Sequence, residues 1–284
     1  MKTKTIKKIL LKLLFGAIAS FFAVMIIVPV LYAIFGAFKD NQEVLTSAKL
    51  LPKKWTTENM VYAWKKINFF KYVANSVIIA FFAVITHVLF ATMSAYAFSR
   101  RQRKCRIMRA IKKVYLVSMF FALGPCTLYP VFKMVNDLRM TESYLGLIFV
   151  EIGASVAHII LVEGYLSGIG ESFDEAATID GCSFFAIYWR IILPLIRPVM
   201  AVIALLSFTA SWNSYMMPMI LTMGRPELRP LTVAIVELRT DGEAATMWSV
   251  IMAGANISII PMIIIYILAN KQFVSGLTLG GIKG

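Results

Sequence analysis

The chain has 284 residues, of which 59% are apolar and only 15% are charged, and its mean hydropathy is +0.76. Soluble domains are roughly half apolar and a quarter charged, so this composition excludes an ordinary soluble protein and indicates that lipid surrounds much of the chain. The net charge of +14 lies in short basic blocks between long apolar runs. Basic blocks beside membrane spans set the topology of the chain and contact anionic lipid headgroups. This placement explains the positive charge without nucleic-acid binding.

Six apolar segments predict the membrane spans. Five of them lack Asp, Glu, Lys and Arg and come close to or exceed the roughly 20 residues that a span needs. The remaining one contains Glu151 and His158 but is otherwise apolar from residue 144 to residue 162, and Glu163 lies near its inner end. The first segment is longer than the apolar part of a signal peptide and has no small-residue cleavage site after it, so we expect it to be retained. We therefore predict an all-α membrane protein with one polytopic domain, spans at about 13–38, 72–98, 114–132, 144–166, 199–223 and 247–270, and terminal tails at 1–12 and 271–284.

The distribution of cations predicts the orientation of these spans. The tail before the first span and the loop after the second together hold thirteen cations and no acidic residue, whereas the loops on the opposite side mix both signs. By the positive-inside rule both termini are cytoplasmic, and so is the segment between the fourth and fifth spans. The three cysteines, Cys105, Cys126 and Cys182, follow no metal-ligand or redox spacing, so we expect neither a metal site nor a disulfide.

The polar segment from Glu171 to Pro198 predicts two short helices joined by a sharp turn. Ser172 and Glu175 have the spacing of a capping box at the start of the first helix. Gly181 can adopt the left-handed conformation that ends a helix. The second helix is expected to end where Pro194 forces a bend into the fifth span.

This segment, which we call the elbow, has features of a docking surface. Ala176 and Ala177 form a small patch that another backbone can approach closely, and apolar side chains flank the turn on both sides. The second helix is predicted to run from about Ser183 to Leu193. Residues alone leave two interpretations open: the elbow fits a groove of another protein, or it is a loop whose apolar side chains rest on lipid.

Three sequence patterns resemble one family of membrane proteins. The pattern E-A-A-x-x-D-G at 175–181, followed by I-x-L-P-x-x-x-P at 191–198, resembles the EAA loop of ABC importer permeases. The pattern W-N-x-x-x-x-P at 212–218 resembles carbohydrate-importer permeases. The ending at 276–284 is similar to the tail of the smaller permease subunit of the maltose transporter and its oligosaccharide relatives.

The resemblance implies the fold, the function and the partners of the chain. It implies a type I ABC importer permease subunit, in the cytoplasmic membrane of a prokaryote, that moves a carbohydrate of the oligosaccharide class by alternating access. A second permease subunit, two copies of an ATPase subunit and an extracytoplasmic sugar-binding protein are the implied partners. The chain itself lacks G-x-x-x-x-G-K-[ST], so we expect no enzyme activity and no bound cofactor, with ATP and Mg²⁺ on the ATPase.

The resemblance also assigns roles to individual residues. In this family the elbow is a coupling helix that contacts the ATPase, which assigns that contact to Glu175, Ala176, Ala177, Asp180 and Gly181. The family tail reaches between the ATPase subunits, and a second contact is therefore expected at Gly276, Thr278, Gly280 and Gly281.

Two further sets of residues are candidates for transport chemistry. Sugars bind to aromatic faces and to amides and hydroxyls, so the candidates along the substrate pathway are Trp212, Asn213, Tyr215 and Tyr129, although helix packing explains each of them equally well. The alternative hypothesis is a proton-coupled secondary transporter that uses Glu151, His158 and Glu163, because ionisable groups inside membranes are often functional. A purely structural scaffold explains the spans but not the elbow.

Overall fold

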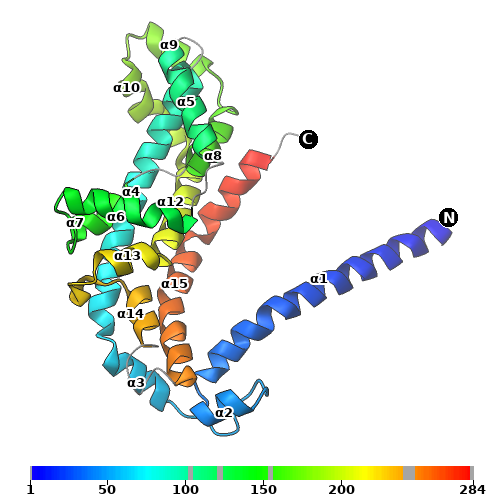
Figure 1. The fold of residues 1–284 in the computed structure, drawn as a ribbon. Helices are drawn as coiled ribbons and strands as arrows, with labels where there is room; N and C mark the ends of the chain where they lie inside the picture. Colours follow the sequence, from blue (N-terminus) through cyan, green and yellow to red (C-terminus); the bar gives the residue numbers. More distant parts are fainter. Residues whose placement is uncertain (1, 102–104, 120–123, 153–155, 239–246, 282–284) are drawn as a thin grey trace. The chain divides into compact units, whose positions relative to one another are not determined.

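The computed structural model describes residues 2–101, 105–119, 124–152, 156–238 and 247–281 (Figure 1). Every regular element among these residues is a helix, which confirms the predicted all-α class. Three described helices are long and apolar enough to cross a membrane, and up to five spans result if each of two bent helix pairs counts as one. The sixth span and the cytoplasmic termini stay predictions.

The chain divides into two compact units. One consists of residues 1–69 and 235–260, and the other of residues 70–234 and 261–284. Helices α14 (Leu231–Glu237) and α15 (Trp248–Gly281) contribute residues to both units.

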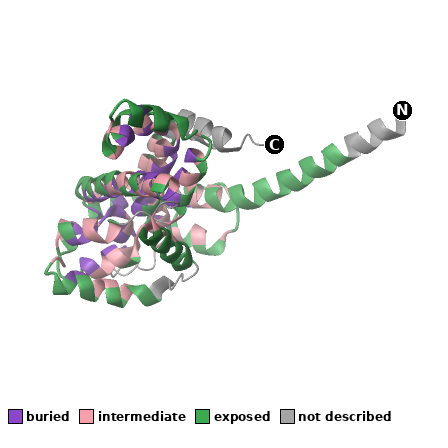
Figure 2. Ribbon diagram, turned by 90° about the horizontal axis from the view of Figure 1, so that it is seen from above, coloured by how far each residue is buried: buried purple, intermediate pink, exposed green. Residues whose placement is uncertain are grey.

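The first unit begins with α1 (Lys2–Gly36), followed by α2 (Asn41–Thr46) and α3 (Glu58–Lys66). The side chains of α1 from residue 11 to residue 30 are all exposed (Figure 2). An apolar helix that is exposed on all sides needs lipid or another membrane protein around it. Polar side chains hold the rest of this unit together: Asn59 donates to the carbonyls of Ala37 and Lys39, at 2.9 and 2.7 Å.

The second unit is built around α4 (Phe69–Arg101) and contains most of the chain. Its main core joins the second half of α4 to α8 and to the elbow helices, through buried residues such as Ala91, Ala95, Val162 and Ile192. The two alanines leave room for neighbouring helices to approach closely. The elements of this unit, in chain order, are α4, α5 (Arg106–Ser118), a 3₁₀ turn (Gly124–Thr127), α6 (Leu128–Asp137), α7 (Tyr144–Glu151), α8 (Val156–Leu166), α9 (Ser172–Ile179), α10 (Phe184–Ile187), a π-helical turn (Tyr188–Ile192), α11 (Leu193–Leu195), α12 (Arg197–Trp212), α13 (Met216–Leu221), a 3₁₀ turn (Pro226–Leu228) and parts of α14 and α15.

The predicted span at 114–132 differs from the structure. Helix α5 ends at Ser118, and a 3₁₀ turn at Gly124–Thr127 precedes α6, which continues to Asp137; residues 120–123 lie outside the described part. Pro130 stands in the first turn of α6, where the N–H that proline lacks has no helical partner in any case. Pro130 is therefore compatible with the start of a helix rather than with the interior of one long span.

The other predicted spans are also interrupted or extended. Helices α7 and α8 meet at 48°, across residues 153–155 that lie outside the described part. The predicted span at 199–223 contains a break at 213–215, between α12 and α13. Helix α15 continues to Gly281, beyond the predicted boundary at residue 270.

Asn75 joins three parts of the second unit near the start of α4. Its amide donates to the carbonyls of Glu227 and Arg229, at 2.9 and 2.8 Å, and its oxygen accepts from the Tyr144 hydroxyl at 2.6 Å. The neighbouring Ser76 hydroxyl accepts from the Leu231 N–H at 2.8 Å. Buried side chains thus provide hydrogen-bond partners for a non-helical segment, as burial requires.

We predict that Asn75→Leu destabilises the chain by about 2–3 kcal/mol, because two carbonyls and the Tyr144 hydroxyl lose a buried partner. Thermal unfolding of the protein in detergent measures the effect. Thr86→Ala is the control on the same helix, since the Thr86 hydroxyl bonds only to carbonyls of its own turn. An equal loss of stability in both variants would contradict the role given to Asn75.

Candidate functional site

The first elbow helix, α9, begins without the predicted capping box. Ser172 lies inside the helix, and Glu171 takes the N-cap position without a side-chain hydrogen bond. A capping serine needs an extended backbone, whereas Glu171 is already helical, with φ −68° and ψ −14°. The prediction of a cap at Ser172 is therefore wrong. The acidic first turn formed by Asp174 and Glu175 is present and suits the helix dipole.

The turn of the elbow confirms the prediction for Gly181. Its φ is +80°, in the left-handed region, and two hydrogen bonds close the end of α9. The Cys182 N–H donates to the Ala177 carbonyl at 2.9 Å, and the Gly181 N–H donates to the Thr178 carbonyl at 3.0 Å. This is a Schellman motif, in which glycine is strongly preferred. A Cβ at Gly181 would meet no atom within 4 Å, so backbone strain alone opposes a side chain there.

The second elbow helix begins with a serine cap, at Ser183 rather than at Ser172. The Ser183 hydroxyl accepts from the Ala186 N–H at 3.3 Å. Helix α10 then passes through the π-helical turn and α11, and the chain bends by 80° before α12. The sequence predicts this bend at Pro194, but it lies two residues later at Ile196, where φ −92° and ψ 8° leave the helical region.

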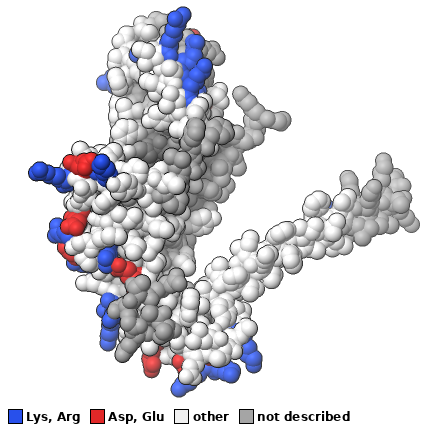
Figure 3. All heavy atoms as spheres, viewed as in Figure 1, with Lys and Arg blue, Asp and Glu red and all other residues white. Residues whose placement is uncertain are grey.

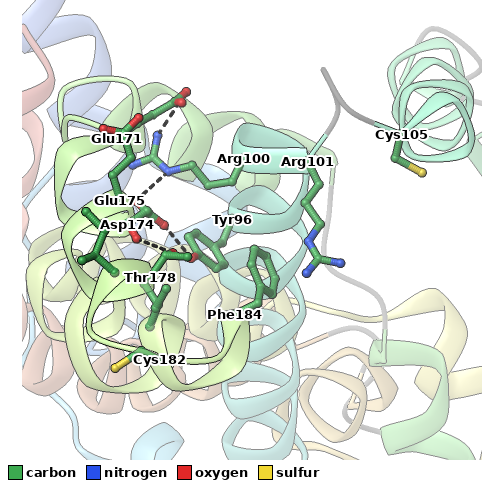
Figure 4. Close-up of a pocket in the computed structure, with 12 residues that line it drawn as sticks. Tyr96, Arg100, Arg101, Cys105, Glu171, Asp174, Glu175, Thr178, Cys182 and Phe184 are labelled. Carbon is green, nitrogen blue, oxygen red and sulfur yellow. Dashed lines mark hydrogen bonds and ion pairs between the residues drawn. The ribbon is translucent and has the colours of Figure 1, made fainter.

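Two side chains from the end of α4 hold α9 in place (Figure 4). The Tyr96 hydroxyl donates to Asp174 Oδ1 at 2.6 Å, and Arg100 Nε donates to Asp174 Oδ2 at 3.0 Å. A second guanidinium nitrogen of Arg100 donates to the Ile169 carbonyl at 3.0 Å. The side chains of Arg100 and Asp174 are 9% and 16% exposed, so this ion pair is largely shielded from water.

Aromatic packing attaches the second elbow helix to α4 as well. The Tyr96 ring stacks on Phe184 with centroids 4.5 Å apart, and the Arg101 guanidinium lies 4.1 Å from the Phe184 centroid. The hydroxyls of Thr92 and Tyr188 are 2.8 Å apart. Both helices of the elbow are therefore fixed to α4, and a displacement of the elbow has to move the end of α4.

The structure separates the predicted ATPase-contact residues into two groups. Glu175, Ala176, Asp180 and Gly181 are exposed, whereas Ala177 is only 4% exposed and packs in the core beneath the elbow. Ala177 therefore does not contribute to the small exposed patch that the alanine pair predicts. Ile179 is 86% exposed and shares the outer face of α9 with Glu175, Ala176 and Asp180.

A cavity of about 960 Å³ lies between the end of α4 and the elbow. Arg100 and Arg101 of α4 line it together with three acidic residues of the elbow, Glu171, Asp174 and Glu175 (Figure 4). Sequence reasoning missed the role of Tyr96 and Arg100. Their spacing of four residues, which places both on one face of α4, was the available signal.

The predicted substrate-pathway residues have different surroundings. The buried Trp212 stacks on Phe208, with centroids 5.4 Å apart, and its carbonyl accepts from the Thr232 hydroxyl at 2.6 Å. Asn213 and Tyr215 belong to the break between α12 and α13. Asn213 is exposed and its amide donates to the Thr209 carbonyl at 2.9 Å. Tyr129 is 72% exposed on α6.

Two ionisable residues of the alternative hypothesis have different partners. Glu163 forms an ion pair with Lys112 at 2.7 Å. The buried His158 lies beside His87, with ring centroids 5.6 Å apart. The third residue, Glu151, is the last residue of α7. The predicted tail contacts Gly276, Thr278, Gly280 and Gly281 belong to α15, and their side chains lie outside the described part.

The fold is that of an all-α membrane protein whose elbow is attached to a helix long and apolar enough to span the membrane. Residues 107–274 match the family described as "Binding-protein-dependent transport system inner membrane component", and the chain belongs to this family. The resemblance to carbohydrate ABC importer permeases is thereby confirmed. The proton-coupled alternative gains no support from the matches.

Individual relatives match over nearly the whole chain. The galactooligosaccharides transport system permease protein GanQ of Bacillus subtilis is 32% identical over 96% of both chains. The trehalose/maltose transport system permease protein MalG of Thermococcus litoralis is 32% identical over 100% of both. A crystal structure of a bacterial ABC transporter involved in the import of the acidic polysaccharide alginate matches with a TM-score of 0.78 at 27% identity, over 93% of this chain and 96% of the other.

We predict that Asp174→Asn destabilises the chain by about 3 kcal/mol, because the largely buried Arg100 would keep only the exposed Glu171, 4.0 Å away, as a counter-ion. Thermal unfolding in detergent measures the loss. The matched control is Glu227→Gln, which removes an exposed ion pair with Arg225 and should cost less than about 1 kcal/mol. Similar losses in the two variants would show that the Asp174 pair does not hold the elbow.

Proposed function

We propose that this chain is the smaller transmembrane permease subunit of an ABC importer for a carbohydrate of the oligosaccharide class. The names of the relatives support the substrate class, since they refer to galactooligosaccharides, to trehalose and maltose, and to alginate. The location is the cytoplasmic membrane of a prokaryote, with both termini in the cytoplasm. The basic residues at the N-terminus and between the second and third predicted spans support this orientation.

The attachment of the elbow to α4 carries this proposal. Glu175, Ala176, Ile179, Asp180 and Gly181 present an exposed surface for an ATPase subunit. Behind this surface, the Asp174 contacts and the aromatic stack connect both elbow helices to α4. Closure of the ATPase subunits then moves the end of α4 together with the elbow.

The length of α4 explains how such a movement reaches the other side of the membrane. Its 33 residues extend over about 50 Å, more than the roughly 30 Å of the hydrocarbon core. A helix moves as a rigid body over such a distance more readily than a loop. A tilt imposed at the elbow therefore opens or closes a cavity elsewhere along α4, which is alternating access.

The family implies the partners of the chain. A second permease subunit pairs with the chain, two copies of an ATPase subunit bind the elbows, and an extracytoplasmic sugar-binding protein delivers the substrate. ATP and Mg²⁺ belong to the ATPase subunits, and this chain binds no cofactor and is not an enzyme. We place a second ATPase contact at the end of α15, at Gly276, Thr278, Gly280 and Gly281.

The break between α12 and α13 is the part of the substrate pathway that we assign to this chain. Non-helical backbone at membrane depth is tolerated only where protein buries it or where it lines a water-filled cavity. Asn213 and Tyr215 lie in this break, and the exposed Asn213 side chain offers its amide oxygen to a sugar hydroxyl. Trp212 supports the break through its stacking on Phe208 instead of contacting sugar.

Reconstitution with the partner subunits tests the proposed function. We expect ATP-dependent uptake of one or more oligosaccharides into proteoliposomes, together with sugar-stimulated ATPase activity that requires the binding protein. A panel of neutral and acidic oligosaccharides identifies the substrate. Uptake by this chain alone, driven by a pH gradient without ATP, would contradict the importer and favour the proton-coupled alternative.

We expect Gly181→Val to uncouple ATP hydrolysis from transport. A β-branched residue in the left-handed backbone at φ +80° is strained by roughly 1–2 kcal/mol or more, so we expect the turn to reorganise. The space around the Cβ position is open, so the surrounding packing should stay intact. Uptake and the stimulation of ATP hydrolysis by sugar should both fall at least about tenfold, a factor that corresponds to about 1.4 kcal/mol, while basal ATP hydrolysis persists.

Gly164→Val is the control for this variant. A Cβ at Gly164 would also meet no atom within 4 Å, but Gly164 stands in helix α8 and needs no left-handed backbone. The control should keep most of its activity. Co-purification with the ATPase distinguishes uncoupling from loss of assembly, and wild-type activity of Gly181→Val would remove the coupling role from the elbow.

A further inference from the structure

A second cavity beside the elbow has a largely apolar lining that includes one arginine. It has a volume of about 450 Å³, within the range of roughly 300–1,000 Å³ that is usual for ligand pockets. Among the described residues that line it, Arg101 alone is charged. Most of the other side chains that line it are apolar or aromatic and come from α4, α5 and α10, among them Phe90, Met93, Phe98, Ile111, Tyr115 and Phe185. We call this cavity the lateral groove.

The position of the groove along α4 separates its apolar part from its charged part. The α4 residues from Phe90 to Phe98 lie within a helix long and apolar enough to span the membrane, and Arg101 is the last residue of that helix. The apolar part of the cavity lies within the span and matches the acyl chain of a phospholipid. The cation at the end of the helix matches its headgroup. Phe90 is 49% exposed and Phe185 is 62% exposed, so lipid can reach the groove from the side.

The charges around the groove favour an anionic occupant. Two acids near the groove have cationic partners: Asp174 pairs with Arg100, and Glu163 pairs with Lys112. Glu171 and Glu175 line the neighbouring cavity, not the groove. Arg101 is exposed and forms no ion pair with any described residue. Lys and Arg side chains gather over this part of the second unit in Figure 3.

We propose that the lateral groove binds an anionic phospholipid, with one acyl chain among the apolar side chains and the phosphate on Arg101. The Arg101 guanidinium lies over the face of Phe184, 4.1 Å from its centroid, which orients the planar group and leaves its edge available for two hydrogen bonds to a phosphate. A segment of another protein would need acidic residues at the same place to match this charge.

The bound lipid would brace the elbow. Phe184 contacts both Arg101 and Tyr96, and the Tyr96 hydroxyl holds Asp174. An acyl chain in the groove would fill the space between α4, α5 and α10, and would limit rocking of α10 against α4. Lipid composition therefore affects the stiffness of the elbow, independently of which solute the protein transports.

Native mass spectrometry of the full-length chain, purified with its accompanying subunits and titrated with phosphatidylglycerol or phosphatidylcholine, tests this proposal. We expect preferential retention of phosphatidylglycerol. Arg101→Gln should weaken its binding about fivefold, the usual contribution of one cation near a lipid surface. Ser94→Leu, which fills the groove without changing charge, should weaken it to a similar extent, while Arg101→Lys should retain much of the binding.

Lys133→Gln on α6 is the control, because it removes one cation outside the groove and should leave lipid binding unchanged. Three outcomes would overturn the proposal. The first is equal retention of the two lipids. The second is an unaltered affinity of Ser94→Leu for phosphatidylglycerol, which would indicate attraction to the surface charge alone. The third is photocrosslinking from position 94 to a protein subunit instead of to lipid. Thermal unfolding of each variant shows whether it is folded.

Discussion

The largely buried contact of Asp174 with Tyr96 and Arg100 links the elbow to the membrane helices, and the other features of the site depend on it. Withdrawing these two charges from water is costly, and the cost is offset only because the carboxylate receives two hydrogen bonds and the guanidinium has further acceptors. Such a contact adds little net stability but specifies one geometry, because losing Asp174 leaves Arg100 with only the exposed Glu171, 4.0 Å away. In the proposed function the elbow transmits force between subunits, and a single fixed geometry serves that role. The aromatic stack of Tyr96 on Phe184 extends the same attachment to the second elbow helix.

The same demand for paired polar groups explains the broken helices of the second unit. Where α12 ends, the Trp212 carbonyl accepts from the Thr232 hydroxyl, and the Asn213 amide donates to the Thr209 carbonyl. Near the start of α4, Asn75 supplies donors to two loop carbonyls. Both of these segments thus have side-chain partners close by, which is the condition for irregular backbone in a membrane protein.

The elbow shows which features of a site can be predicted from sequence. The turn at Gly181 is predicted correctly because it depends on the backbone freedom of one residue and on hydrogen bonds within six residues. The cap at Ser172 is predicted wrongly, although its pattern is equally local. Asp174 is bound to α4, and Glu171 already has a helical backbone, so α9 begins earlier than its sequence suggests. Ala177 is assigned to the surface and is buried, because the sequence does not show which side of α9 faces α4.

Composition and the length of the apolar runs determined the all-α membrane class, because that class depends on transfer of the chain to lipid. The positions of glycine and proline determined the existence of the elbow and its left-handed turn, because these depend on local backbone geometry. The motif at 175–198 was sufficient to indicate the family. Only the tertiary structure decided that Tyr96 and Arg100, more than 70 residues away in sequence, hold Asp174. It also decided where the spans break, which face of α9 is exposed and that a groove lies beside Arg101. These features depend on contacts between helices distant in sequence, and the periodicity of a single helix carries no information about its neighbours.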